Sequence, residues 1–159
     1  SDNLKFFVNG CDETLLEYPG IRDDMTAEEK QLAIDKSHIS FIAETVLGIR
    51  IGKLFFSHSS MNPNCTLENQ SPKDVLWTRA NSVLGHYTGY FIIHGHTPVE
   101  QIIFTPGYYL NIDTKCFKGG SLSCVELRSG ATIQVRNRSL ELTVGQIKDW
   151  DQVADFANQ

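Results

Sequence analysis

The chain has 159 residues, a formal net charge of −5 and 41% hydrophobic residues. That length suffices for one globular domain with a substantial core, and the composition excludes a disordered or collagen-like chain. Lysine and arginine do not cluster in the sequence, which argues against a nucleic-acid partner. The apolar runs are far shorter than the roughly 20 residues that span a bilayer, and no signal peptide is visible. We therefore expect a cytoplasmic protein without a membrane partner.

The first half of the chain predicts one strand and one long helix. Leu4–Val8 is a short apolar run that leads into a turn, as expected of a strand. Thr26-Ala27-Glu28-Glu29 matches the capping box that begins a helix. Apolar residues then recur at helical spacing, so we expect a long helix up to about Leu47, where Gly48 can end it.

After this helix the sequence predicts mainly strands. Lys53–Phe56 is typical of a buried strand, and Pro72–Trp77 resembles the start of a short helix with proline in its first turn. Further strands are expected at Gly89–Ile93, Tyr108–Ile112, Ser121–Leu127, Ala131–Val135 and Ser139–Val144. A helix followed by mostly β-strands indicates an α/β or α+β layering, with the helix packed on a sheet.

Three histidines lie directly at the ends of predicted strands. His58 follows one strand, and His94 and His96 flank a glycine at the end of the next. Strand ends in layered α/β proteins face ligand crevices, and neutral imidazole is the commonest protein ligand of transition metals. Because side chains alternate along a strand, we expect one of His94 and His96 to serve a site and the other to pack.

Five short motifs follow one another in the second half of the chain. They are Phe56-Ser57-His58-Ser59, Trp77-Thr78-Arg79, Gly95-His96-Thr97-Pro98, Asn111-Ile112-Asp113-Thr114-Lys115 and Gly119-Gly120-Ser121-Leu122. In this order they resemble the C-terminal half of the phosphoprotein phosphatase branch of the calcineurin-like metallophosphoesterases, particularly its small bacterial and phage Ser/Thr phosphatases. The corresponding family motifs are His-Ala-Gly, Trp-x-Arg, Gly-His-Thr-Pro, Ile-Asp-Thr-Gly and a Gly-Gly hairpin.

The resemblance implies a fold, a reaction and a cofactor. The fold would be α/β, a partial calcineurin-like metallophosphoesterase sandwich over residues 1–145 with a C-terminal helix or tail over 146–159. The reaction would be metal-dependent hydrolysis of phosphomonoesters, in which two divalent ions activate water and stabilise in-line displacement in a complete enzyme. Histidine and carboxylate ligands suit Mn, Fe or Zn, so a divalent transition metal is the expected cofactor.

The resemblance also assigns roles to individual residues. His58 and His96 would be ligands of one shared metal, and Arg79 would hold two phosphate oxygens through its planar guanidinium. Asp113-Thr114 would shape the turn behind the site. We assign Trp77 to packing, because tryptophan is more often a core residue than a functional one.

The upstream half of the family pattern is not matched. Gly-Asp-x-His-Gly and Gly-Asp-x-x-Asp-Arg-Gly, which supply most ligands of the first metal, are absent. The next family motif, Gly-Asn-His-Glu, would fall at Gly10-Cys11-Asp12-Glu13, where Cys11 replaces the ligand asparagine and Asp12 replaces the acid-catalyst histidine. A shift of one residue would instead offer Asn9 as the amide ligand. No catalytic residue is therefore assigned.

Carboxylates elsewhere would have to replace the missing ligands. The candidates before His58 are Asp12, Glu13, Asp23 and Asp24. Asp23 and Asp24 precede the capping box directly, so we expect them to be a solvated pair rather than ligands.

Two hypotheses from different classes follow. The first is an incomplete or divergent catalytic domain that acts on phosphorylated protein or a small phosphomonoester, completed by a missing N-terminal segment or a companion chain. The second is a non-catalytic binding or regulatory module that retains a degenerate phosphatase fold. The surface loops Pro19–Asp24 and Cys65–Pro72 would set the choice of substrate, and loop chemistry does not transfer by fold analogy.

Overall fold

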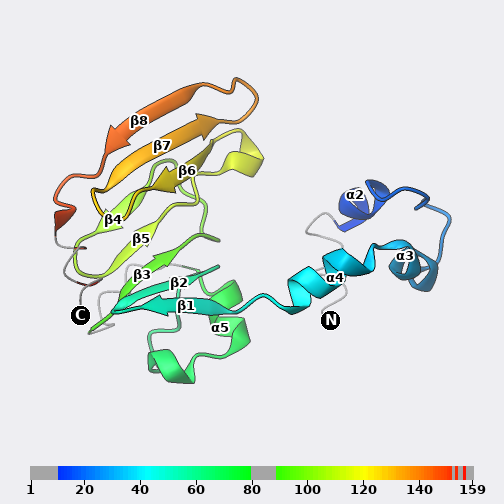
Figure 1. Ribbon diagram of the computed structural model, residues 1–159, viewed down its shortest axis with the longest axis horizontal. Helices are drawn as coiled ribbons and strands as arrows, with labels where there is room; N and C mark the ends of the chain where they lie inside the picture. Colours follow the sequence, from blue (N-terminus) through cyan, green and yellow to red (C-terminus); the bar gives the residue numbers. More distant parts are fainter. Residues whose placement is uncertain (1–10, 80–88, 152, 154–155, 157–159) are drawn as a thin grey trace. The chain divides into compact units, whose positions relative to one another are not determined.

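The structure is a computed structural model that describes residues 11–79, 89–151, 153 and 156 (Figure 1). The chain divides into two compact units, residues 1–45 and residues 46–159. Helices come first and mostly strands follow, which confirms the expected α/β class. The strand predicted at Leu4–Val8 lies outside the described residues. In the part of the chain that is described, no helix is long and apolar enough to cross a bilayer.

The first unit consists of short helices. They are α2 (Cys11–Leu16), α3 (Ala27–Ala33) and α4 (Lys36–Ala43). The capping box predicted at the start of α3 is confirmed, because the Thr26 hydroxyl accepts the N–H of Glu29 at 3.2 Å and the Glu29 carboxylate accepts the N–H of Thr26 at 2.8 Å. This reciprocal pair satisfies two N–H groups that have no partner inside the helix.

The single long helix predicted from here to Leu47 is wrong. The chain becomes extended at Ile34, and the carboxylate of Asp35 then accepts the N–H of Ser37 at 2.8 Å and begins α4 as a new N-cap. Aspartate competes in this way with the backbone bonds of a continuous helix. Gly48 does not end a helix either, because it is the first residue of the strand β1.

The second unit is built on a five-stranded sheet, sheet A, in the order β1-β2-β3-β5-β4. Its strands are β1 (Gly48–Ile51), β2 (Leu54–Ser57), β3 (Phe91–His94), β4 (Ile103–Thr105) and β5 (Tyr109–Asn111). β3 pairs in parallel with both β2 and β5, whereas β1 and β4 pair antiparallel at the two edges. The strands predicted at the positions of β2, β3 and β5 are confirmed. The short edge strands β1 and β4 were not anticipated.

A short helix lies between β2 and β3 in the chain. It is α5 (Pro72–Trp77), and it confirms the helix predicted there. The Ser71 hydroxyl accepts the N–H of Asp74 at 3.3 Å, and the Asp74 carboxylate accepts the N–H of Ser71 at 2.8 Å. Ser59, just after β2, donates its N–H to the carbonyl of Val75 at 2.9 Å. The start of the helix is thereby attached to the loop that follows β2.

A second sheet, sheet B, contains the last three strands as an antiparallel meander. They are β6 (Ser121–Val125), β7 (Ala131–Arg136) and β8 (Leu142–Gln146), and all three were predicted. One face of sheet B aligns Cys124, Ile133 and Val144 across the three strands, and these three side chains are exposed. The opposite face is more polar and carries Thr132 and Gln134.

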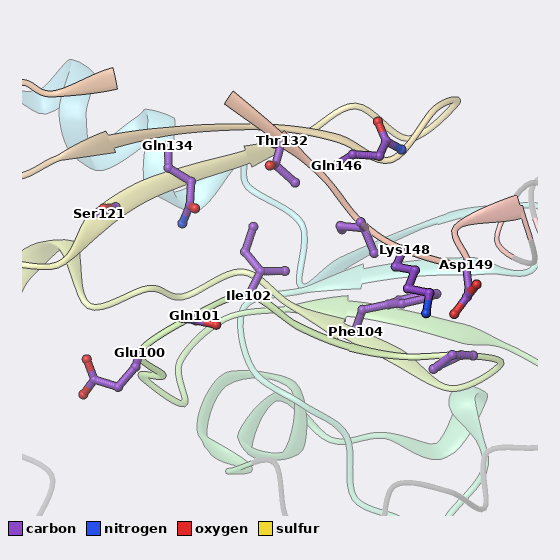
Figure 2. Close-up of a pocket in the computed structure, with 13 residues that line it drawn as sticks. Glu100, Gln101, Ile102, Phe104, Ser121, Thr132, Gln134, Gln146, Lys148 and Asp149 are labelled. Atoms are coloured by element: carbon purple, nitrogen blue, oxygen red, sulfur yellow. The ribbon is translucent and has the colours of Figure 1, made fainter. Parts of the chain in front are cut away.

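The polar face of sheet B borders a cavity of about 690 Å³. Phe104 of β4 lines this cavity together with Thr132 and Gln134 of β7, and Figure 2 shows Ile102 extending toward the β7 side chains. The described residues around it include no histidine or cysteine. This space between the sheets therefore offers no cluster of metal ligands or nucleophiles.

Trp150 joins the two sheets at the core of the second unit. Its ring lies 6.4 Å from that of Phe91 and 5.4 Å from that of Phe104, both in sheet A. Its indole N–H donates to the carbonyl of Leu127, just after β6, at 2.9 Å. The other buried members of this core are Leu54, Ile93, Leu110 and Val153. A chain segment that follows the last strand thus supplies the central aromatic of the core.

We expect Gly130→Ala to destabilise the second unit more than Gly107→Ala does. Both glycines have left-handed backbones, with φ of 75° and 78°. A Cβ at Gly130 would lie 2.3 Å from Cγ of Trp150, whereas nothing lies within 4 Å of one at Gly107. Gly107→Ala should cost only the backbone penalty of about 1 kcal/mol, and Gly130→Ala should cost about 2–4 kcal/mol because the core must also shift. Urea unfolding of both variants measures the difference, and equal losses would contradict the close contact.

Candidate functional site

The chain leaves β2, β3 and β5 at the same edge of sheet A. The parallel pairing continues beyond the strands, because Gly95 donates its N–H to the carbonyl of His58 at 3.0 Å. On the other side of β3, Ile112 donates its N–H to the carbonyl of His94 at 3.1 Å. His58, His96 and Asp113 therefore follow three neighbouring strands at one edge, where ligands of open α/β sheets bind.

His58 and His96 are in direct contact at this edge. Nε2 of His58 lies 3.1 Å from Nδ1 of His96, and the ring centroids are 4.9 Å apart. The backbone of His96 is left-handed, with a φ of 62°. A residue other than glycine is uncommon in this conformation, and such residues concentrate at ligand sites. The structure thus brings together the two histidines that the motifs select.

Arg79 and Trp77 join the pair from the end of α5. Nη1 of Arg79 donates to the carbonyl of His96 at 3.4 Å. The ring of Trp77 meets that of His96 edge to face, with the centroids 5.6 Å apart. Because Trp77 is 50% exposed, its assignment to packing in the core is wrong. It forms one side of the histidine pair instead.

The surroundings of His96 keep its imidazole neutral. Partial burial lowers the pKa of His96, and the nearby His58 and Arg79 lower it further, while Asp113 acts in the opposite direction. The facing nitrogens of His58 and His96 lie 3.1 Å apart, within hydrogen-bond distance. The neutral form is also the one that binds a metal.

His94 is the buried member of the pair that flanks Gly95. It is 2% exposed, and its ring lies 5.6 Å from that of Tyr109. The carbonyl of Gly95 lies 2.9 Å from its Nδ1, which assigns the proton to that nitrogen. Nε2 has no hydrogen-bond partner among the described residues. Burial lowers the pKa of His94, so the ring is neutral and packs in the sheet.

The loop after β5 is attached to the loop of His96 by Asn111. This side chain is 1% exposed, its amide donates to the carbonyl of Thr97 at 2.8 Å, and its carbonyl oxygen accepts the N–H of Asp113 at 3.0 Å. The Thr114 hydroxyl donates to the carbonyl of Ser121 at 2.5 Å in the same turn. The sequence analysis missed the role of Asn111. A polar residue between the apolar Leu110 and Ile112 of a buried strand was the available signal.

The geometry of the histidine pair fits two ligands of one metal ion. Metal–nitrogen bonds of about 2.0–2.1 Å place two ligand nitrogens of one ion about 2.9–3.4 Å apart, and the pair measures 3.1 Å. However, no group of three histidine, cysteine, aspartate or glutamate residues that could hold a metal exists among the residues that the structure describes. The described residues therefore contain no complete metal centre.

The residues proposed as substitute ligands lie in the first unit. The carboxylate of Asp24 accepts a hydrogen bond from Nε of Arg22 at 3.1 Å, and Asp23 and Asp24 are both exposed, as expected of a solvated pair. Cys11 and Asp12 begin α2, but their side chains are not among those described, and Asn9 lies outside the described residues.

Comparison with models of known protein families finds no match to this chain. A search of curated proteins finds no match either. The function of the chain is therefore inferred from its motifs and from the geometry described above.

Proposed function

We propose that this chain carries part of the active site of a metal-dependent phosphomonoesterase of the metallophosphoesterase type. Its substrate would be a phosphorylated protein or a small phosphomonoester. The observation that carries the proposal is the contact of 3.1 Å between His58 and His96, with Arg79 beside it, at the carboxyl edge of a parallel sheet. Two imidazoles and one guanidinium are groups that suit a metal ion and a phosphate.

His58 and His96 would hold one divalent transition ion, Mn, Fe or Zn. A bound ion of this kind supplies Lewis-acid polarisation of phosphoryl oxygens and lowers the pKa of bound water. The remaining ligands of a two-metal site would come from residues outside the described set or from a companion chain. The edge-on ring of Trp77 limits the freedom of the His96 ring, which favours a fixed ligand direction.

Arg79 would hold the phosphate group. Within the described part of the chain, Nη1 of its guanidinium donates to the carbonyl of His96 at 3.4 Å. A guanidinium has five N–H donors in a planar fork, a geometry that suits two oxygens of a phosphate. Because the carbonyl of His96 orients this guanidinium, phosphate and metal ligand would be fixed by the same short loop.

A second candidate is a non-catalytic binding or regulatory module with a degenerate phosphatase fold. The observation that favours it is that no third metal ligand accompanies His58 and His96 among the described residues. In this case Arg79 would still bind an anion, but the protein would not need a metal. Metal binding therefore separates the two candidates.

Metal binding is expected to be weak and to depend on both histidines. Calorimetric titration with Mn²⁺ and with Zn²⁺ should give a heat that the His58→Ala/His96→Ala double variant loses. His38→Ala is the control, because this histidine lies in the first unit, where its Nδ1 is 2.8 Å from the hydroxyl of Tyr18. Equal heats from the unaltered chain and the double variant would remove the metal site and favour the binding module.

We expect little or no turnover of p-nitrophenyl phosphate by this chain, because two histidines do not hold the two ions that such hydrolysis uses. An assay with saturating Mn²⁺ measures this, with His58→Ala as the control. Robust hydrolysis that is lost in His58→Ala would contradict the proposal of an incomplete site and indicate a complete one.

Arg79→Ala should weaken the binding of orthophosphate about tenfold, because charge-assisted bonds to a phosphate are lost. Arg128→Ala is the matched control, since this exposed arginine lies in the turn between β6 and β7. Titration followed by NMR chemical shifts measures both affinities. If the two variants lose affinity equally, Arg79 has no specific phosphate role.

A further inference from the structure

A second cavity, of about 470 Å³, begins two residues beyond His96 in the chain. Pro98 and Glu100 line one part of it, and the turn between β5 and β6 lines another. The cations in its lining are Lys115, Lys118 and Arg136. We call this space the basic cavity. It shares no lining residue with the histidine pair, but it continues from the same loop.

The charge of the basic cavity is opposite to that of the whole chain. Three cations against the single carboxylate of Glu100 leave a formal charge of +2 in the lining, whereas the chain carries −5. The carboxylate of Glu100 forms an ion pair with Nζ of Lys115. Neither Lys118 nor Arg136 forms an ion pair within the described part of the chain. Two cations are therefore available for an anion that enters the cavity.

The backbone that presents Lys115 is held in an unfavourable conformation. Its φ is 59°, in the left-handed region that residues other than glycine seldom adopt. The phosphatase motif that this segment resembles has glycine at the corresponding place. The carbonyl of Lys115 accepts the N–H groups of Lys118 at 2.8 Å and of Gly120 at 2.9 Å, and these bonds fix the turn.

The backbone of this turn is closely packed at Gly120. A Cβ at Gly120 would lie 2.0 Å from the carbonyl oxygen of Thr114. Asp113 closes the other side, because its carboxylate accepts the N–H of Lys115 at 3.3 Å and its carbonyl accepts the N–H of Val99 at 2.9 Å. The turn of the basic cavity is thus bonded directly to the segment that follows His96.

We propose that the basic cavity binds an acidic side chain next to the phosphorylated residue of a peptide substrate, so that the substrate is an acidic phosphopeptide. The proposal rests on the proposed function, which places the phosphate at Arg79 and the histidine pair. Pro98, which lines the cavity, follows His96 by two residues in the chain, so the histidine pair and the cavity involve one loop. Lys118 and Arg136 would receive the acidic side chain, with Lys115 adding to the local field.

Direct peptide binding tests this without requiring catalysis or metal. The probes are fluorescein-labelled peptides in which a serine is followed by three glutamates, or by three glutamines, each with and without a phosphate on the serine. Fluorescence anisotropy with the full chain should show the unphosphorylated glutamate peptide binding at least about tenfold more tightly than its glutamine counterpart. Salt should reduce this preference, since the cations are exposed.

Variants distinguish binding in the basic cavity from a general effect of the protein's net charge. Lys118→Gln/Arg136→Gln should remove the preference for glutamate, whereas Lys36→Gln/Arg128→Gln, which removes the same charge elsewhere, should keep it within about twofold. Lys115→Gly should weaken the glutamate peptide without lowering the melting temperature, because glycine suits the left-handed backbone. A merely structural role of Lys115 would instead lower the melting temperature and leave the preference unchanged.

Each outcome bears on one proposal only. Equal binding of the glutamate and glutamine peptides, or equal losses in the two double variants, overturns the basic cavity as a subsite. Orthophosphate could instead bind in the cavity through Lys118 and Arg136, with no preference for the glutamate peptide. In that case the cavity binds free phosphate and the acidic-peptide proposal is wrong. Loss of metal binding with a retained glutamate preference would instead count against the phosphatase site alone.

Discussion

The parallel pairing of β3 with β2 and β5 is the constraint on which the candidate site depends. All four residues of β3 are buried, so its position is fixed by packing on both faces. The register that sets Phe56 opposite Ile93 and His94 opposite Asn111 makes the chain leave three strands at one level. A slip of either neighbour would separate the histidines, even though no site residue had changed.

Some locally unfavourable features of the second unit lie at this edge, whereas Arg138, Leu140 and Asp149 have left-handed backbones elsewhere in the unit. His96 and Lys115 have left-handed backbones, with φ of 62° and 59°. Nε2 of His94 is buried and has no partner among the described residues. Each such feature costs free energy that the rest of the unit must supply, and the hydrogen bonds of Asn111 are a visible part of that support.

Local patterns predicted the elements well, and tertiary contacts explain what was missed. Capping chemistry located the starts of α3 and α5, because it depends on residues three positions apart. The prediction of one long helix was wrong at Asp35. The side chain of this residue caps a new helix, and the periodicity of apolar residues gives no sign of such a cap. The edge strands β1 and β4 are short and gain their order from pairing. Trp77 was wrongly assigned to the core, because the general preference of tryptophan for buried positions does not predict its contact with the ring of His96.

The motifs selected His58, His96 and Arg79 correctly as neighbours, because each follows an element whose position the sheet determines. They could not reveal the basic cavity, whose cations come from a turn and from β7, far apart in the sequence. On a chain of net charge −5 this has a physical consequence. Long-range repulsion from acidic ligands is screened beyond about 8 Å at physiological salt, so an anion is bound only where local cations prevail. Arg79 and the basic cavity both offer local cations, so both proposed functions would depend on recognition of an anionic ligand.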